Sequence, residues 1–230
     1  MRSRPLKAFI YSMPIPITLV MLATNATVTA SHLIGVVSLV LFFFVVAWLI
    51  LRLGWHTLPA VAGGVVFYLL VALGAKALPT PAYLPTLAVV VVVWIGVVVH
   101  AFTRGLPARQ SEQPDAPVTL RGEALRLGVL TVATFSLVFL GRFLGGFAVT
   151  FPYSGILVSF GLGSETRAFA RNFAIGSISL VAFFTAHWLV QDSVDQWLEL
   201  VVAWASFFAV YGVVALLRRT ITRKATTPAG

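Results

Sequence analysis

Two apolar segments of the chain are interrupted by prolines, and hydroxyl side chains surround both interruptions. Pro14 and Pro16 lie in the first segment and Pro152 in a later one. A proline removes a backbone N–H donor and frees the carbonyl about four residues earlier. In lipid that carbonyl needs another donor, so such breaks attract hydroxyls, water or a ligand. The residues beside the two breaks are Tyr11, Ser12, Thr18, Thr150, Tyr153, Ser154 and Gly155.

The candidate binding residues follow from these breaks. We expect two half-helices that face each other across a polar cavity, while the alternative is two ordinary kinks packed by small residues. Arg142 lies beside glycines and is either an anion or carbonyl contact at the mouth of the site or an arginine that reaches lipid headgroups. The substrate-binding candidates are Tyr11, Ser12, Pro14, Pro16, Arg142, Pro152, Tyr153 and Ser154.

A second candidate group carries charge. Glu165, Arg167 and Arg171 fall in one short loop after the segment that contains Pro152. They are candidates for a substrate gate or a lipid-headgroup contact. The alternative is a helix start, in which Ser164 is the capping residue and Glu165 lies at the positive end of the helix.

Enzyme chemistry has little support in the sequence. The absence of cysteine excludes disulfides, thiolate metal sites and cysteine nucleophiles. The four histidines have no metal-ligand spacing on one helix, so we expect no metal and no cofactor. Ser154 and His187 could form a hydrolase pair, but the run 151–155 lacks the usual Gly-x-Ser-Gly context. We also place none of the seven acidic residues deep inside a membrane span, so a site here would work without a buried carboxylate.

The composition places these residues in a membrane protein. The chain has 230 residues, of which 59% are hydrophobic and 10% charged, whereas soluble domains have about 45–50% and about 25%. We predict an all-α, polytopic integral membrane protein of about eight transmembrane helices, because each span needs roughly 20 apolar residues. The expected spans are Ala8 to Ala23, Leu33 to Leu51, Thr57 to Gly74, Leu84 to Phe102, Leu125 to Phe143, Phe147 to Leu162, Phe173 to Val190 and Leu198 to Leu217.

The distribution of charge gives the expected orientation. Cytoplasmic loops of membrane proteins collect Lys and Arg. With eight spans and both termini in the cytoplasm, all of the 16 basic residues except Lys76 and Arg142 fall inside. The net charge of +9 therefore reflects orientation and does not indicate nucleic acid. Because the composition is rich in Ala, Val, Gly and Arg, we expect a bacterial inner membrane.

The spans fall into two halves with a suggestion of internal repetition. We expect an N-terminal membrane half (1–104), a cytoplasmic linker (105–123), a C-terminal membrane half (124–219) and a basic, polar tail (220–230). Pro14 and Pro152 are 138 residues apart, and Phe43 and Phe183 are 140 apart, each with similar neighbours. Spans 1–3 and 6–8 could therefore form an inverted repeat, because five spans is an odd step. The alternative is chance similarity between apolar segments.

The second half also resembles a known family. The residues that carry the likeness are Arg142, Gly145, Phe151-Pro152, Gly163-Ser164-Glu165 and Arg171, followed by two more spans. Over about residues 124–217 this pattern resembles GlpM, a family of small four-span bacterial inner-membrane proteins. The resemblance implies a membrane location and a four-span unit, and it implies no reaction.

Three functional classes fit these observations. The first is a small transporter or permease for a neutral or anionic, amphipathic small molecule, with its pathway near spans 1 and 6. The second is a non-transporting accessory or assembly subunit of a larger membrane complex. The third is a lipid-acting membrane enzyme. The expected partners are the lipid bilayer and either a second copy of the chain or another membrane protein.

Overall fold

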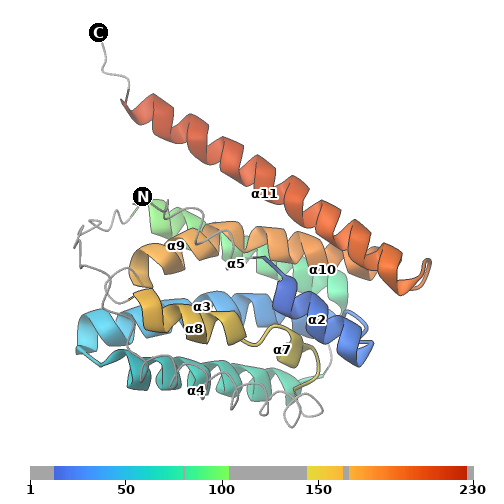
Figure 1. Cartoon of the computed structure of the whole chain (residues 1–230), viewed down its shortest axis with the longest axis horizontal. Coiled ribbons are helices and arrows are strands. Elements are labelled where there is room, and N and C mark those ends of the chain that lie inside the picture. The colour runs from blue at the N-terminus through green and yellow to red at the C-terminus, as the bar shows by residue number, and fades with distance from the viewer. Residues whose placement is uncertain (1–12, 80, 104–143, 163–165, 227–230) are drawn as a thin grey trace, which may run out of the picture.

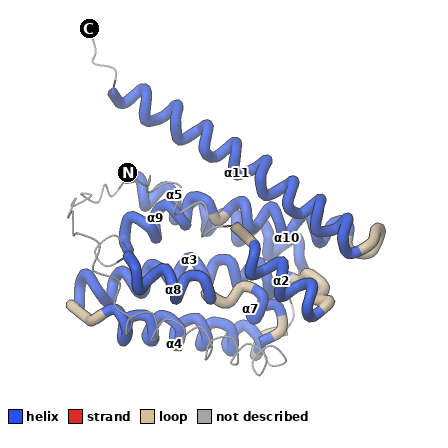
Figure 2. Tube along the Cα trace, viewed as in Figure 1, coloured by secondary structure: helices blue, strands red, loops and turns tan. Residues whose placement is uncertain are grey.

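The computed structural model is built of helices, and it describes residues 13–79, 81–103, 144–162 and 166–226 (Figures 1 and 2). No strand occurs within these ranges. The helices are α2 (Ile15–Thr24), α3 (Ala30–Leu53), α4 (Thr57–Lys76), α5 (Tyr83–Thr103), α7 (Gly146–Val149), α8 (Tyr153–Leu162), α9 (Thr166–Gly176), α10 (Ile178–Val190) and α11 (Gln196–Thr226).

Five helical stretches in the described residues are long and apolar enough to cross a membrane. They coincide with the second, third, fourth, seventh and eighth expected spans, which confirms an all-helical chain compatible with a membrane protein. The stretches are Ala30–Leu53, Thr57–Lys76, Tyr83–His100, Thr166–Val190 and Gln196–Leu217.

None of the other three expected spans is seen as one long helix in the described residues. The fifth lies outside the described residues. The described part of the first is α2, and the sixth is divided into α7 and α8. Helices α2 and α8 have ten residues each, which gives about 15 Å at 1.5 Å per residue against a hydrocarbon core of about 30 Å. Neither helix is long enough to cross a bilayer alone.

Helix α3 lies at the centre of the bundle and contacts α4, α5, α7, α9 and α10. Its direction relative to α9 and α10 follows from ring contacts. His32 at the start of α3 packs against Phe184 near the end of α10, at 5.1 Å between ring centroids. Phe43 further along α3 packs against Phe173 in α9 at 4.7 Å. Residue numbers rise on one side as they fall on the other, so α3 and the α9–α10 pair are antiparallel.

Helix α11 departs from the rest of the bundle (Figure 1). It packs mainly against α10 and leaves one side uncovered, including Trp197, Val201 and Leu216. The helix continues to Thr226, into the segment expected to be a polar tail, because no glycine or proline occurs between Leu217 and Thr226. An uncovered apolar face of this length suits contact with lipid or with another helix.

Candidate functional site

A small cavity lies where α2 and α8 begin. Its volume is about 20 Å³, enough for about one water molecule. Pro16 and Ile17 of α2 line one side, and Thr150, Phe151 and Ser154 line another. The remaining wall comes from α3, α9 and α10 and is apolar. Its residues, together with Met13, are Leu39, Phe43, Phe173 and Leu180.

The prolines begin helices at this cavity. Pro14 is the N-terminal cap of α2, Pro16 lies in its first turn, and Pro152 directly precedes α8. Proline is tolerated in the first turn because the missing N–H has no helical partner there. We expected breaks inside the two spans, and for Pro152 the structure has one, between α7 and α8. Pro14 and Pro16 begin α2, and because the residues before Met13 lie outside the described residues, an interruption of the first span stays a prediction.

Two short helices thus start at the same place and extend in opposite directions (Figure 1). The first N–H groups of any helix lack helical partners, and the helix dipole makes that end positive. No side chain caps α2. The cavity therefore combines two hydroxyls, Thr150 and Ser154, with the positive ends of α2 and α8.

A buried tyrosine holds the break between α7 and α8. The hydroxyl of Tyr68 in α4 donates to the carbonyl oxygen of Phe147 at 2.8 Å and lies 2.8 Å from the hydroxyl oxygen of Thr150. Both side chains are almost completely buried. Gly35 of α3 lies directly against Thr150, where a Cβ atom would collide with the threonine side chain. Tyr68 and Gly35 therefore fix the position of one cavity hydroxyl.

Of the predicted binding residues, Pro16 and Ser154 line the cavity. Tyr153 turns away from it, because its hydroxyl donates to the carbonyl of Ala148 at 3.2 Å. Tyr11, Ser12 and Arg142 lie outside the described residues.

Two of the three predicted gate residues are described, and neither lines the cavity. Arg167 and Arg171 lie in α9 with half-buried side chains. Glu165 lies outside the described residues. Arg167 lies in the first turn of α9.

Helix α2 is tied to α11 by a polar contact. The Thr18 hydroxyl donates to the carbonyl of Pro14 at 2.7 Å and accepts the indole N–H of Trp204 at 3.1 Å. This contact joins residues 186 positions apart. The last helix therefore fixes the first short helix at the wall of the cavity.

The chain matches no protein-family model, no curated protein and no solved structure. The function proposed below therefore depends on the geometry of the described residues.

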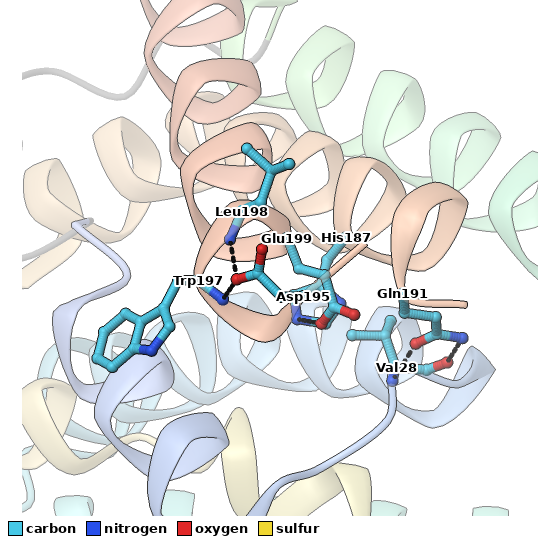
Figure 3. A network of polar contacts seen from close by, with 7 residues as sticks. All are labelled: Val28, His187, Gln191, Asp195, Trp197, Leu198 and Glu199. Atoms are coloured by element: carbon cyan, nitrogen blue, oxygen red, sulfur yellow. Dashed lines mark hydrogen bonds and ion pairs between the residues drawn. The ribbon is translucent and has the colours of Figure 1, made fainter. Parts of the chain in front are cut away.

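A second polar cluster lies where α10 ends and α11 begins (Figure 3). Nε2 of His187 is 3.4 Å from Oε2 of Glu199, and both side chains are buried. Next to it, the Val28 amide donates to the Gln191 side chain at 2.8 Å, and Gln191 Nε2 donates back to the Val28 carbonyl at 3.4 Å. Asp195 accepts the amides of the first α11 turn.

This cluster corrects one expectation. We expected a site without a buried carboxylate, but Glu199 is only 8% exposed. The residue lies in the first turn of α11, and the α10–α11 hairpin folds it against His187. The signal in the sequence was a histidine near the end of one span and a glutamate at the start of the next.

Neither a Ser154–His187 hydrolase pair nor a metal site is formed by the described residues. Ser154 and His187, both within the described residues, make no hydrogen bond with each other, since Ser154 lines the cavity and His187 pairs with Glu199. Among the residues that the structure describes, no group of three His, Asp or Glu side chains is placed to hold a metal ion.

Proposed function

We propose that this protein is a small membrane transporter whose pathway passes through the cavity between the starts of α2 and α8. The observation that carries the proposal is that two ten-residue helices, each begun at a proline, start at one hydroxyl-bearing cavity. In secondary transporters, interrupted helices of this kind supply substrate contacts near the middle of the membrane.

The spacing of the helices supports an inverted repeat. Ile15 and Tyr153, where α2 and α8 begin, are 138 residues apart, and so are their last residues, Thr24 and Leu162. The next elements correspond in length, because α3 has 24 residues and the Thr166–Val190 stretch has 25. Each of these is followed by a further long helix, α4 or α11.

The directions of the helices support the same relationship. In an inverted repeat, equivalent helices run in opposite directions through the membrane. Helix α3 is antiparallel to the equivalent α9–α10 pair, as the contacts of His32 and Phe43 indicate. We infer that α2–α4 and α8–α11 are the two copies, and that the cavity lies at their interface.

The cavity also suggests a class of substrate. Two hydroxyls and two positive helix ends favour an oxygen-bearing group that is neutral or anionic. The aliphatic and aromatic residues on the opposite wall favour an apolar remainder. We therefore propose a small amphipathic molecule. The cavity has room for about one water molecule in the present conformation, so a substrate enters only when the two halves move apart.

The membrane arrangement belongs to the same proposal. We propose eight spans in a bacterial inner membrane with both termini in the cytoplasm, in agreement with the distribution of the 16 basic residues. Five apolar helices of sufficient length support it. The resemblance of residues 124–217 to the GlpM family stays a prediction.

A flux measurement tests the proposal. Purified protein is incorporated into vesicles, and the entry of small neutral and anionic solutes is followed by light scattering. We expect at least one amphipathic solute to enter faster than into empty vesicles, and we expect Ser154→Trp to abolish the difference by filling the cavity. Leu84→Trp, on an exposed face of α5, is the matched control and keeps the flux. Entry that is never faster than in empty vesicles argues against transport.

One observation favours a different role, as an accessory subunit. Helix α11 packs mainly against α10, and its Trp197 is 70% exposed. Such a face suits a neighbouring membrane protein as well as lipid. Under this alternative, a stable partner co-elutes in mild detergent, and Val201→Trp on the uncovered face releases it.

A further inference from the structure

Three ionisable side chains are buried together where α3 begins, α10 ends and α11 begins. His32 is 1% exposed, His187 is 3% exposed and Glu199 is 8% exposed. Buried ionisable groups are costly unless they are paired and hydrogen-bonded. The arrangement of their hydrogen bonds shows which protonation states the cluster can hold.

The hydrogen bonds of His32 assign its proton. The backbone amide of Thr29 donates to Nδ1 at 3.1 Å, so the neutral ring carries its proton on Nε2. That Nε2–H is buried and has no partner. The carbonyl oxygen of Thr29 also lies 3.2 Å from Nδ1, so a proton added to Nδ1 finds an acceptor.

His187 has the complementary arrangement. Its Nε2–H faces the Glu199 carboxylate at 3.4 Å, so the neutral ring has a lone pair on Nδ1. That Nδ1 is buried and has no partner either. His32 therefore presents an unpartnered donor and His187 an unpartnered acceptor. His32 also contacts Phe184, about one helical turn before His187.

We propose that His32, His187 and Glu199 form a site that binds one proton from solution. The proton adds to an imidazole lone pair, one N–H bond forms, no covalent bond breaks, and the charge of the cluster rises by one. On Nδ1 of His187 it makes an imidazolium paired with Glu199. On Nδ1 of His32 it displaces the hydrogen bond from the Thr29 amide and makes an N–H that donates to the Thr29 carbonyl instead. A second proton is less favourable than the first because two imidazolium ions repel each other.

Other titratable groups near the cluster face solvent or have partners of their own. Asp192 and Asp195 of the α10–α11 turn are exposed, and Asp195 caps α11. From α5, Tyr83 bonds to Thr185 at 3.3 Å. Among the described residues, Glu199 is therefore the acidic residue in contact with the cluster, through the ring of His187. Its place in the first turn of α11 also puts the cluster next to the exposed turn, from which a proton can enter.

The site adjoins both halves of the molecule. Gly146, at the start of α7, lies against the His32 ring. Gln191, one turn after His187, holds the segment between α2 and α3 through Val28. The proton site thus contacts α7 and, through Val28, the segment between α2 and α3, although its existence does not depend on transport.

Titration of the four histidines by NMR tests the proposal, with histidine-labelled protein in detergent micelles. We expect His32 and His187 to share one proton in a coupled titration. His187→Gln should change the titration midpoint of His32 by about 1–3 pH units. Glu199→Gln should change the midpoint of His187 by a similar amount. His56→Gln is the matched control, because His56 is exposed before α4, and it should leave both midpoints unchanged.

Two results overturn the proposal. The first is that neither buried ring changes protonation over the pH range in which the protein stays folded. The second is that the two rings titrate independently and neither responds to Glu199→Gln. Because glutamine keeps the shape of glutamate, this variant decides the question even where His187→Gln does not fold, and far-UV circular dichroism checks its helical content.

Discussion

The hydroxyl oxygens of Tyr68 and Thr150 lie 2.8 Å apart in the interior of the bundle, although the residues are 82 positions apart in the chain. Tyr68 comes from a long helix, and Thr150 from the break before α8. The Phe147 carbonyl, which the break leaves without a helical donor, accepts from the same tyrosine. A polar contact between two long-separated segments therefore stabilises the interruption that forms the cavity.

Tyr68→Phe should weaken this interruption. The substitution removes the 2.8 Å contacts of Tyr68 with the Phe147 carbonyl and the Thr150 hydroxyl and leaves only longer bonds of 3.4–3.5 Å from Thr150 to the Gly146 and Phe147 carbonyls, so we expect the free energy of unfolding to fall by about 1–3 kcal/mol. Reversible unfolding in mixed micelles measures it. Tyr83→Phe is the control, since it removes a single 3.3 Å bond to Thr185 and should cost less. Equal losses in the two variants would contradict the role given to Tyr68.

Gly35→Ala should disturb the same place from the other side. The new methyl group meets the Thr150 side chain and forces it or the helix to shift, so we expect a loss of about 1–3 kcal/mol in the free energy of unfolding. Gly96→Ala is the matched control, because nothing lies within 4 Å of the methyl group added to α5. Alanine has the higher helix propensity, so the control should be neutral or more stable by up to about 1 kcal/mol. A harmless Gly35→Ala would show that Thr150 is not tightly held.

Gln191→Leu should loosen the segment before α3. The side chain of Gln191 exchanges two hydrogen bonds with the backbone of Val28, and leucine can replace neither. We expect the Val28 amide to exchange its hydrogen about 5- to 10-fold faster, measured by hydrogen–deuterium exchange. Ser193→Ala, in the exposed turn nearby, should leave that rate unchanged. An unchanged rate in Gln191→Leu would mean that other contacts hold this segment.

The sequence predicts the long helices well, because each is a sustained apolar run with flanking polar residues. The break at Pro152 is also predictable, since proline and its hydroxyl neighbours mark it. The partners of that break were not predictable. Tyr68 occurs in an apolar run without a local signal, and only the packing of α4 against the break brings it to Thr150.

The buried carboxylate was missed for a related reason. Glu199 is close to Asp192 and Asp195 in the chain, and all three look like one polar turn. The first turn of α11 folds back on α10, which buries Glu199 and leaves the other two exposed. Burial at a helix start depends on the angle of the hairpin, and that angle has no signature in the local sequence.

Accessibility at Ser154 decides whether the cavity opens to both sides of the membrane. The chain has no cysteine, so Ser154→Cys introduces a single thiol. Vesicles containing this variant are treated with a membrane-impermeant maleimide, added outside or trapped inside. Ala203→Cys is the buried control and should not react, and Ser193→Cys is the exposed control and should react from one side. We predict that the thiol at position 154 reacts both with maleimide added outside the vesicles and, in a separate experiment, with maleimide trapped inside them. A thiol there that stays as unreactive as the one at position 203, or that reacts from one side alone, would contradict a pathway through the cavity.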